Sequence, residues 1–230
     1  MAGHAYSARA LHSERLTNER RSAGPGAALG VAALCVAALA LLWVVAALVP
    51  STHVKDAVLL YDFTTLGRPR LDSAGEALLE ALAVLPFILW GVALLAIAFA
   101  RERPRVALAV AVVMGLAPLT TEILKPLTAH RHAIYNGATV GPVSWPSGHS
   151  TAALALVFGV LLVSPARLRP FVAVIGALYA AAIGCFLLIL SWHMPSDVLG
   201  GYLVAIVWAA LAVAALQAAE RRWPSGKTPV

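Results

Sequence analysis

Apolar residues are concentrated in six long runs that alternate with short polar segments along the chain. The runs cover residues 27–49, 78–100, 106–124, 150–164, 170–190 and 198–219. Most of them approach the ~20 residues that a helix needs to cross a bilayer core of roughly 30 Å. Because lipid offers no hydrogen-bond partner to an exposed backbone, each run is expected to be a helix. The pattern predicts an all-α bundle of six transmembrane helices.

Polar segments divide the chain into a membrane domain, residues 27–219, and two tails. The tails, 1–26 and 220–230, are expected to be cytoplasmic, and the first lacks a helical pattern and is expected to be disordered. The outer connection 50–77 is long, and its stretch 54–62 has the pattern of a short helix lying in the membrane interface. Its carboxylates are expected to be solvated. They are Asp56, Asp62, Asp72 and Glu76.

Composition excludes the soluble globular class, because 60% of the residues are hydrophobic and only 12% are charged. Twelve of the 17 Lys and Arg residues lie in the tails and in the connections 101–105 and 165–169. By the positive-inside rule these segments are cytoplasmic, so both termini face the cytoplasm. The net charge of +6 then reflects membrane anchoring, and no nucleic-acid partner is expected. We expect an integral protein of the inner, or plasma, membrane.

Side chains able to perform chemistry gather where the predicted helices reach the outer face. They are Lys125 and Arg131 after the third run, Ser147, Gly148 and His149 at the start of the fourth, and His193 and Asp197 between the fifth and sixth. Helix direction brings all of these positions to one depth although they span more than 70 residues of chain. Ionisable residues at membrane helix ends indicate function by default.

One subset of these residues is suited to hold a phosphate group. Lys125 and Arg131 can neutralise phosphate oxygens, and the arginine fork can bind two at once. Ser147 and Gly148 at the start of a helix would direct backbone amides at the anion. Gly148 has no Cβ, so the backbone can approach the ligand closely.

The histidines are suited to a covalent phosphoryl transfer. His193 can attack phosphorus through one ring nitrogen while Asp197 holds the other. His149 can then protonate the leaving group. Cations and amides stabilise the developing charge, so neither a metal nor a cofactor is required. A metal site is the alternative use of four imidazoles, those of His130, His132, His149 and His193, but it leaves Pro-Ser-Gly unexplained.

The order of these motifs resembles the type 2 phosphatidic acid phosphatase superfamily, which shares its site with vanadium haloperoxidases. That family has Lys-x6-Arg-Pro, then Pro-Ser-Gly-His, then Ser-Arg-x5-His-x3-Asp. The second motif matches without change at 146–149, and the resemblance covers about residues 78–215. It implies six membrane helices with the site at the outer leaflet. It also implies that His193 is the phosphorylated nucleophile, His149 the acid and base, and Asp197 the orienting carboxylate.

Two motifs depart from the family pattern. Arg131 lies six residues after Lys125 rather than seven, and His132 stands at the seventh position. Either the loop absorbs the one-residue difference, or protonated His132 substitutes as an auxiliary phosphate ligand. Leu187 stands where the third motif has its arginine. Losing one phosphate contact would cost on the order of 2–4 kcal/mol of transition-state stabilisation. A replacement cation is therefore expected near the catalytic histidines, and the candidates are Arg131, His132, Arg68 and Arg70.

Together these patterns predict a membrane lipid phosphatase whose site faces the periplasm or the extracellular side. Its substrate would be a lipid phosphate monoester or pyrophosphate, namely polyprenyl pyrophosphate, phosphatidic acid or phosphatidylglycerol phosphate. Hydrolysis would pass through a phosphohistidine. Two alternatives stay open: a catalytically impaired relative that binds a lipid phosphate, and a phosphotransferase that uses the same site.

Overall fold

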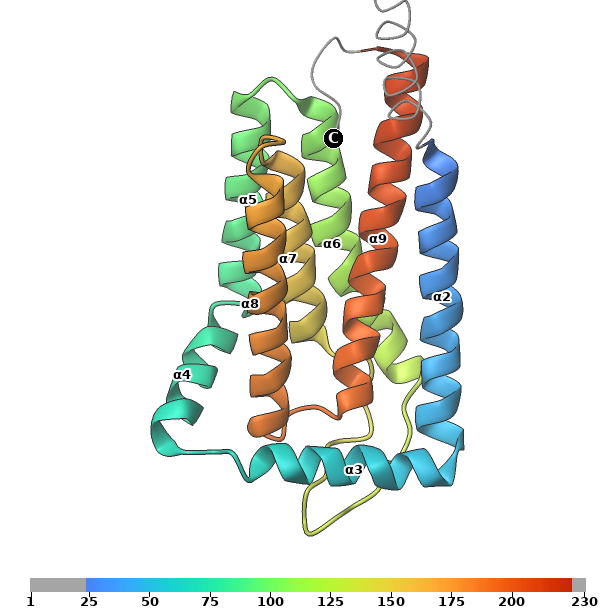
Figure 1. Cartoon of the computed structure of the whole chain (residues 1–230), viewed down its shortest axis with the longest axis vertical. Coiled ribbons are helices and arrows are strands. Elements are labelled where there is room, and N and C mark those ends of the chain that lie inside the picture. Colours follow the sequence, from blue (N-terminus) through green and yellow to red (C-terminus); the bar gives the residue numbers. More distant parts are fainter. Residues whose placement is uncertain (1–23, 225–230) are drawn as a thin grey trace, which may run out of the picture.

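The computed structural model describes residues 24–224, which form a bundle of helices (Figure 1). In chain order the helices are α2 (Pro25–Leu48), α3 (Pro50–Thr64), α4 (Pro69–Glu80), α5 (Val84–Ala100), α6 (Pro104–Leu127), α7 (Gly148–Val163), α8 (Arg169–Ile189) and α9 (Pro195–Arg222). The only β pairing in this part of the chain is an isolated bridge between Tyr135 and Ala138. The predicted all-α class is therefore confirmed for the described residues.

Six of these helices stand side by side, and α3 lies across one end of the bundle (Figure 1). The start of α2 and the end of α9 both lie at the opposite end. α9 packs against α2, α6 and α7, while α7 also contacts α5, α6 and α8. α7 is thus surrounded by other helices, and its first turn faces the α3 end of the bundle.

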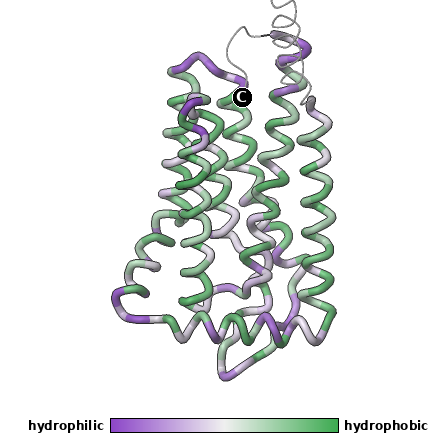
Figure 2. The backbone as a smooth tube through the Cα atoms, viewed as in Figure 1, coloured by the Kyte–Doolittle hydropathy of each residue, from purple (hydrophilic) through white to green (hydrophobic). Residues whose placement is uncertain are grey.

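Hydropathy along the bundle is that of an integral membrane protein. Apolar residues cover the middle of the upright helices, and polar residues collect at both ends (Figure 2). Within residues 24–224, α2, α6, α8 and α9 are long and apolar enough to cross a membrane, and α4 with α5 makes a fifth span if the bent pair counts as one. α7 has 16 residues. Six membrane-spanning helices and cytoplasmic termini therefore stay predictions.

The predicted second run, 78–100, is not one helix. It is divided between the end of α4 and the whole of α5, and the two helices meet at an angle of 54°. Pro86 explains why α5 starts afresh here. Proline lacks an N–H and is best tolerated in the first turn of a helix, where Pro86 lies. Hydropathy alone does not reveal this break, because residues 81–86 are all apolar.

The outer connection 50–77 is more ordered than its sequence suggested. The predicted helix at 54–62 is present but longer, since α3 begins at Pro50, a residue well suited to the first helical position. α4 was not predicted. The predicted domain bounds are close to the observed helix limits, Pro25 and Arg222. The predicted tails lie mostly outside the described residues.

Candidate active site

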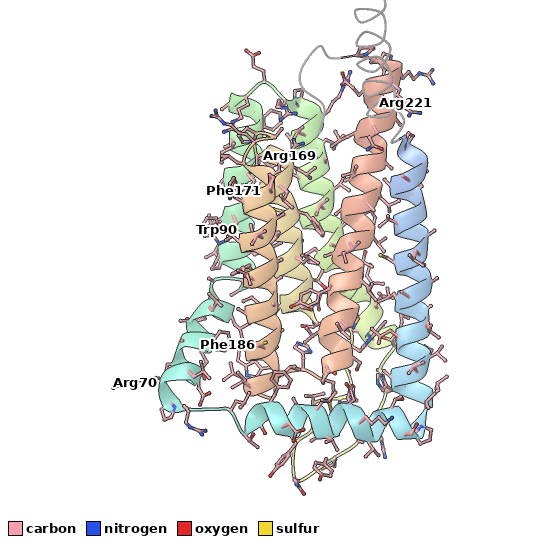
Figure 3. The ribbon with its side chains drawn as sticks, in the orientation of Figure 1. Arg70, Trp90, Arg169, Phe171, Phe186 and Arg221 are labelled. Atoms are coloured by element: carbon pink, nitrogen blue, oxygen red, sulfur yellow. The ribbon has the colours of Figure 1, made fainter. Side chains whose placement is uncertain are left out.

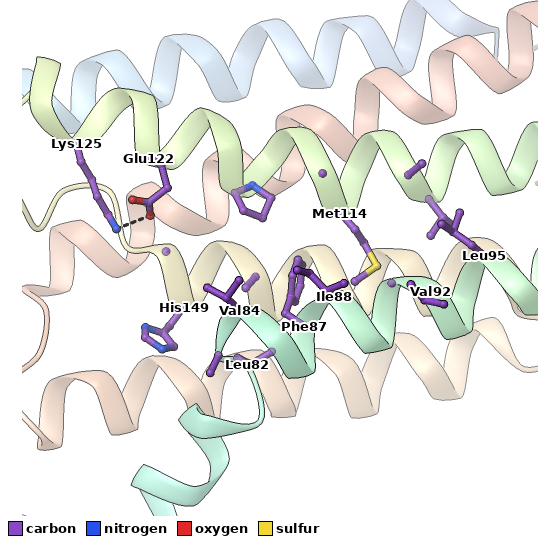
Figure 4. A pocket seen from close by; sticks show the side chains of 18 of the residues that line it. Leu82, Val84, Phe87, Ile88, Val92, Leu95, Met114, Glu122, Lys125 and His149 are labelled. Carbon is purple, nitrogen blue, oxygen red and sulfur yellow. Dashed lines mark hydrogen bonds and ion pairs between the residues drawn. The ribbon is translucent and has the colours of Figure 1, made fainter.

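A cavity of about 1160 Å³ opens between α5, α6 and α7 and joins two kinds of surface. Its wall along the helices is apolar and includes Phe87, Ile88, Val92, Leu95, Val110 and Met114. Its end nearest α3 is polar and is lined by Glu122, Lys125, Gly148, His149, Trp192 and His193. Figure 4 shows the apolar side chains of α5 leading toward His149, while the linked side chains of Glu122 and Lys125 lie on the other side of the start of α7. Val110 and Lys125 of α6 are 15 positions apart, which corresponds to roughly 22 Å of helix.

The first turn of α7 forms one side of the polar end. Ser147 caps the helix, because its Oγ accepts the backbone N–H of Ser150 at 3.4 Å. Lys125 Nζ lies 2.6 Å from Glu122 Oε1, and this ion pair covers the start of α7. A Cβ at position 148 would lie 3.4 Å from that carboxylate oxygen and 3.5 Å from Nζ. The helix N-terminus, which favours anions, therefore faces a lysine and a carboxylate.

The turn between α8 and α9 forms the other side. His193 Nδ1 lies 3.4 Å from Asp197 Oδ2, and that oxygen also accepts the Met194 N–H at 3.0 Å. The Asp197 side chain is fully buried, and its Oδ1 has no partner within the described chain. The carboxylate therefore faces Nδ1 of His193, which leaves Nε2 as the nitrogen for chemistry. Catalytic contacts are often this long before a substrate binds.

α7 and α9 are joined directly behind these two histidines. The Ser147 N–H donates to the Asp197 carbonyl at 2.9 Å. Thr151 Oγ1 donates to the Gly201 carbonyl at 3.0 Å and lies 3.0 Å from Thr121 Oγ1 of α6. Gly201 has no side chain to hold the helices apart, so the two backbones approach closely. The relative position of His149 and His193 is thus set by a backbone contact.

The structure places some of the predicted site residues at the cavity and others away from it. Lys125, Gly148, His149 and His193 line the cavity, and Asp197 supports His193 from behind. His193 and Lys125 are ionisable neighbours of His149. Ser147 is buried at the helix cap instead of lining the cavity. Arg131 is exposed and is also absent from the lining.

None of the four residues expected to replace the arginine of the third motif lines the cavity. Leu187 is fully buried in an apolar cluster with Ile183 and Leu188. Lys125 is the only Lys or Arg side chain of residues 24–224 that lines the cavity. Of the four candidates, Arg68 binds backbone carbonyls in the link before α4, and Arg70 points outward (Figure 3).

His132 is the remaining candidate for the missing cation. Its Nε2 lies 2.9 Å from Ser144 Oγ, and its ring contacts that of His130. Burial lowers the pKa of His132, while the nearby Asp197 charge opposes that shift. The lowered pKa makes His132 a weaker cation than a free imidazole, and His132 does not line the cavity.

The histidines do not form a metal centre in the described part of the chain. No group of three or more His, Cys, Asp or Glu side chains is close enough there to hold a metal ion. His130 instead packs between His53 and His132, with ring centroids 5.9 and 4.5 Å away. The alternative site of four imidazoles therefore has no geometric support among residues 24–224.

A comparison with known protein families shows which family this chain matches. The model of the PAP2 superfamily matches residues 74–221, which is more than half of the chain. The chain belongs to the PAP2 superfamily. The match begins within α4 and ends within α9, so it includes the whole cavity.

A solved PAP2 structure has the same fold. It is described as the first transmembrane PAP2 type phosphatidylglycerolphosphate phosphatase from Bacillus subtilis. The match has a TM-score of 0.67 and 17% sequence identity, and it covers 85% of this chain and 98% of that one. A search of curated proteins found no match.

Three contributors to the site escaped the sequence interpretation. Glu122 had been noted only as an ion-pair partner of Lys125, yet its carboxylate stands at the start of α7. The apolar wall on α5 carries no motif, so no sequence signal distinguishes it from a lipid-facing surface. Trp192 is the third, because its ring lies 5.6 Å from that of His149, and its position next to His193 was the only available indication.

Proposed function

We propose that the protein is a membrane lipid phosphatase that hydrolyses a phosphate monoester or pyrophosphate on an apolar tail. The observation that carries this proposal is the cavity, because one continuous space has a cationic, histidine-lined end and a long apolar wall. Ligand sites are concave, mostly apolar and equipped with a few converging polar groups. A lipid phosphate has this same division, with a charged head and an apolar tail.

The proposed substrate places its phosphate between Lys125 and the start of α7 and its tail along α5 and α6. The apolar wall of roughly 22 Å approaches the thickness of a bilayer core, roughly 30 Å. It therefore suits a polyprenyl or acyl chain rather than a small soluble ester. Polyprenyl pyrophosphate, phosphatidic acid and phosphatidylglycerol phosphate all meet this description.

The proposed mechanism uses the two histidines in sequence. His193 Nε2 attacks phosphorus, an N–P bond forms, and the P–O bond to the lipid breaks while His149 gives its proton to the leaving oxygen. His149 then takes a proton from water, the water oxygen bonds to phosphorus, and the N–P bond breaks to release phosphate. Asp197 holds Nδ1 throughout. Lys125 and the first amides of α7 stabilise the charge on the phosphoryl oxygens, so the proposed mechanism needs no metal.

The remaining predicted contributors have smaller roles in this proposal. Ser147 acts by capping α7 and thereby fixing the amides that face the anion. Arg131 and His132 lie on the loop before α7, where they would meet the outer part of a larger headgroup. The bundle would have six membrane helices, cytoplasmic termini and a site open to the periplasm or the extracellular side.

The test is inorganic phosphate release by the purified protein in detergent. We expect release from at least one of the three lipid substrates, with a chelator present, and little from a phosphate ester without a tail, such as glycerol 3-phosphate. Equal rates on esters with and without a tail would contradict the proposed use of the apolar wall. Loss of all activity with the chelator would contradict the metal-free mechanism.

A second function is favoured by one observation, the burial of Leu187 without a replacing arginine at the cavity. A relative that has lost this contact would bind a lipid phosphate without hydrolysing it, or would transfer the phosphoryl group to an acceptor. Vanadate binding without phosphate release from any substrate would favour the first of these. Turnover only after addition of an acceptor lipid or sugar would favour the second.

A separate prediction concerns Glu122 and the affinity of the site for phosphate. Replacing it by glutamine should strengthen vanadate or phosphate binding by about 2- to 5-fold, because a partly exposed ion pair contributes up to about 1 kcal/mol. The variant frees the Lys125 ammonium and removes a negative charge from the start of α7. Titration calorimetry would measure the affinity, with Glu76→Gln on α4 as the matched control. Weaker binding in Glu122→Gln alone would show that the carboxylate assists the anion instead of competing with it.

A further inference from the structure

The start of α9 carries Asp197 but has a poor N-cap of its own. Helix N-termini leave backbone N–H groups without partners, and Ser, Thr, Asp or Asn at the N-cap usually accept one of them. Here the N-cap residue is Met194, which has no side-chain oxygen. Asp197 accepts the Met194 N–H in a capping box, and the Asp197 and Val198 N–H groups donate to the Met194 carbonyl. Pro195 has no N–H, so the Ser196 N–H is the donor that needs an acceptor from another part of the chain.

Asp56 of α3 supplies it from 140 residues earlier in the sequence. Its Oδ1 accepts the Ser196 N–H at 3.2 Å, and its Oδ2 accepts the Ser196 hydroxyl at 2.5 Å. Bonds to a carboxylate are among the stronger hydrogen bonds in proteins. Asp56 is therefore the N-cap of α9 in function, although it belongs to a different helix.

The position of Asp56 on α3 is unusual for a carboxylate. α3 turns its buried side, with Ala57 and Leu60 fully buried, toward the bundle, and Asp56 is on that side. Burial raises the pKa of Asp56, while its bonds to Ser196 lower it. A buried carboxylate is costly unless its oxygens are hydrogen-bonded, and both oxygens of Asp56 are bonded to one residue.

That one residue, Ser196, adjoins the proposed catalytic pair. The next residue is Asp197, whose carboxylate faces His193 and whose carbonyl accepts the Ser147 N–H of α7. A shift of the Ser196 backbone would therefore move the orienting carboxylate and the anion-binding turn together. Displacements of about 1 Å near reacting groups can cost roughly 100-fold in rate.

We infer that Asp56 is a positioning residue of the active site, which holds the His193–Asp197 pair in place through Ser196. This inference rests on the proposed phosphatase function. In this proposal α3 does more than lie in the membrane interface, because Asp56 holds the start of α9 in the position that activity requires. Asp56 itself lies outside the cavity lining and touches no substrate.

The kinetic test compares Asp56→Asn with Asp62→Asn, a change of an exposed carboxylate on the same helix. For Asp56→Asn we expect kcat to fall by roughly 10- to 100-fold with KM nearly unchanged, because Lys125 and Gly148 are untouched. Asp62→Asn should keep both constants. Ser196→Ala should lower kcat in the same direction, and the double variant should be no worse than Asp56→Asn. An unchanged kcat in Asp56→Asn, or an equal fall in Asp62→Asn, would overturn the inference.

A second measurement separates this inference from the proposed function. Amide hydrogen exchange in residues 193–201 should rise in Asp56→Asn and not in Asp62→Asn, whether or not the wild type hydrolyses any substrate. If the wild type is inert, the phosphatase proposal fails, while faster exchange confined to Asp56→Asn still supports the positioning contact. Equal exchange in both variants would overturn that contact.

Discussion

Replacing His193 with alanine is expected to reduce phosphate release by roughly 10³- to 10⁶-fold, the range seen when a catalytic nucleophile is removed. No other imidazole in the described chain both lines the cavity and has a carboxylate beside its second nitrogen. Lys125 and the start of α7 are unaffected, so vanadate should still bind. Labelled substrate should also leave no phosphohistidine on this variant.

The matched control is His53→Ala. His53 lies on α3 with its ring against His130, and it does not line the cavity. Phosphate release should stay close to wild type in this variant. Substantial release by His193→Ala, or label trapped on His149 instead, would show that the nucleophile has been assigned to the wrong histidine.

Gly201→Ala is expected to destabilise the bundle by about 3 kcal/mol, at the upper end of the range for overpacking a core. A Cβ at this position would overlap Ser150 Oγ and the Ser147 carbonyl oxygen and would lie 2.9 Å from Thr151 Oγ1. A backbone oxygen inside a helix cannot turn away, so α7 and α9 must separate. Activity should fall as well, since this contact sets the relative position of His149 and His193, the two proposed catalytic histidines.

Gly30→Ala on α2 is the control for this prediction, because no atom lies within 4 Å of the added Cβ. It should keep or raise the stability, since alanine is favoured over glycine in helices by about 1 kcal/mol. The midpoint of thermal unfolding in detergent, followed with phosphate release, measures both variants. A midpoint for Gly201→Ala equal to that of Gly30→Ala would contradict the close packing of α7 on α9.

Much of the bundle could be predicted from hydropathy, because helices in lipid must carry long apolar runs. The same runs supplied helix directions, and these predicted that Lys125, His149 and His193 would meet at one end. The break between α4 and α5 could not be read in this way. It depends on Pro86 within an apolar stretch, where the hydropathy stays high on both sides.

Contacts between distant parts of the chain were the least visible from sequence. Asp56 was expected to be solvated like the other carboxylates of its segment, but it caps a helix that begins 139 residues later. Ser147 matches its motif without change, yet motif identity does not distinguish a side chain that binds ligand from one that caps a helix. Both outcomes depend on which backbone amides the folded helices leave unpaired, and a single sequence does not encode that directly.

The packing of α2 against α9 has a consequence for biosynthesis. At about 5–20 residues per second, the roughly 150 residues between these helices take on the order of 10–30 s to synthesise. During that time α2 lies in the bilayer without its main partner. Its surface is suited to contact with lipid on all sides, since it has a mean hydropathy of 2.8 and little of its span is buried in the bundle. Asp197 also arrives only with α9. The proposed site is therefore completed only when α9 has been synthesised.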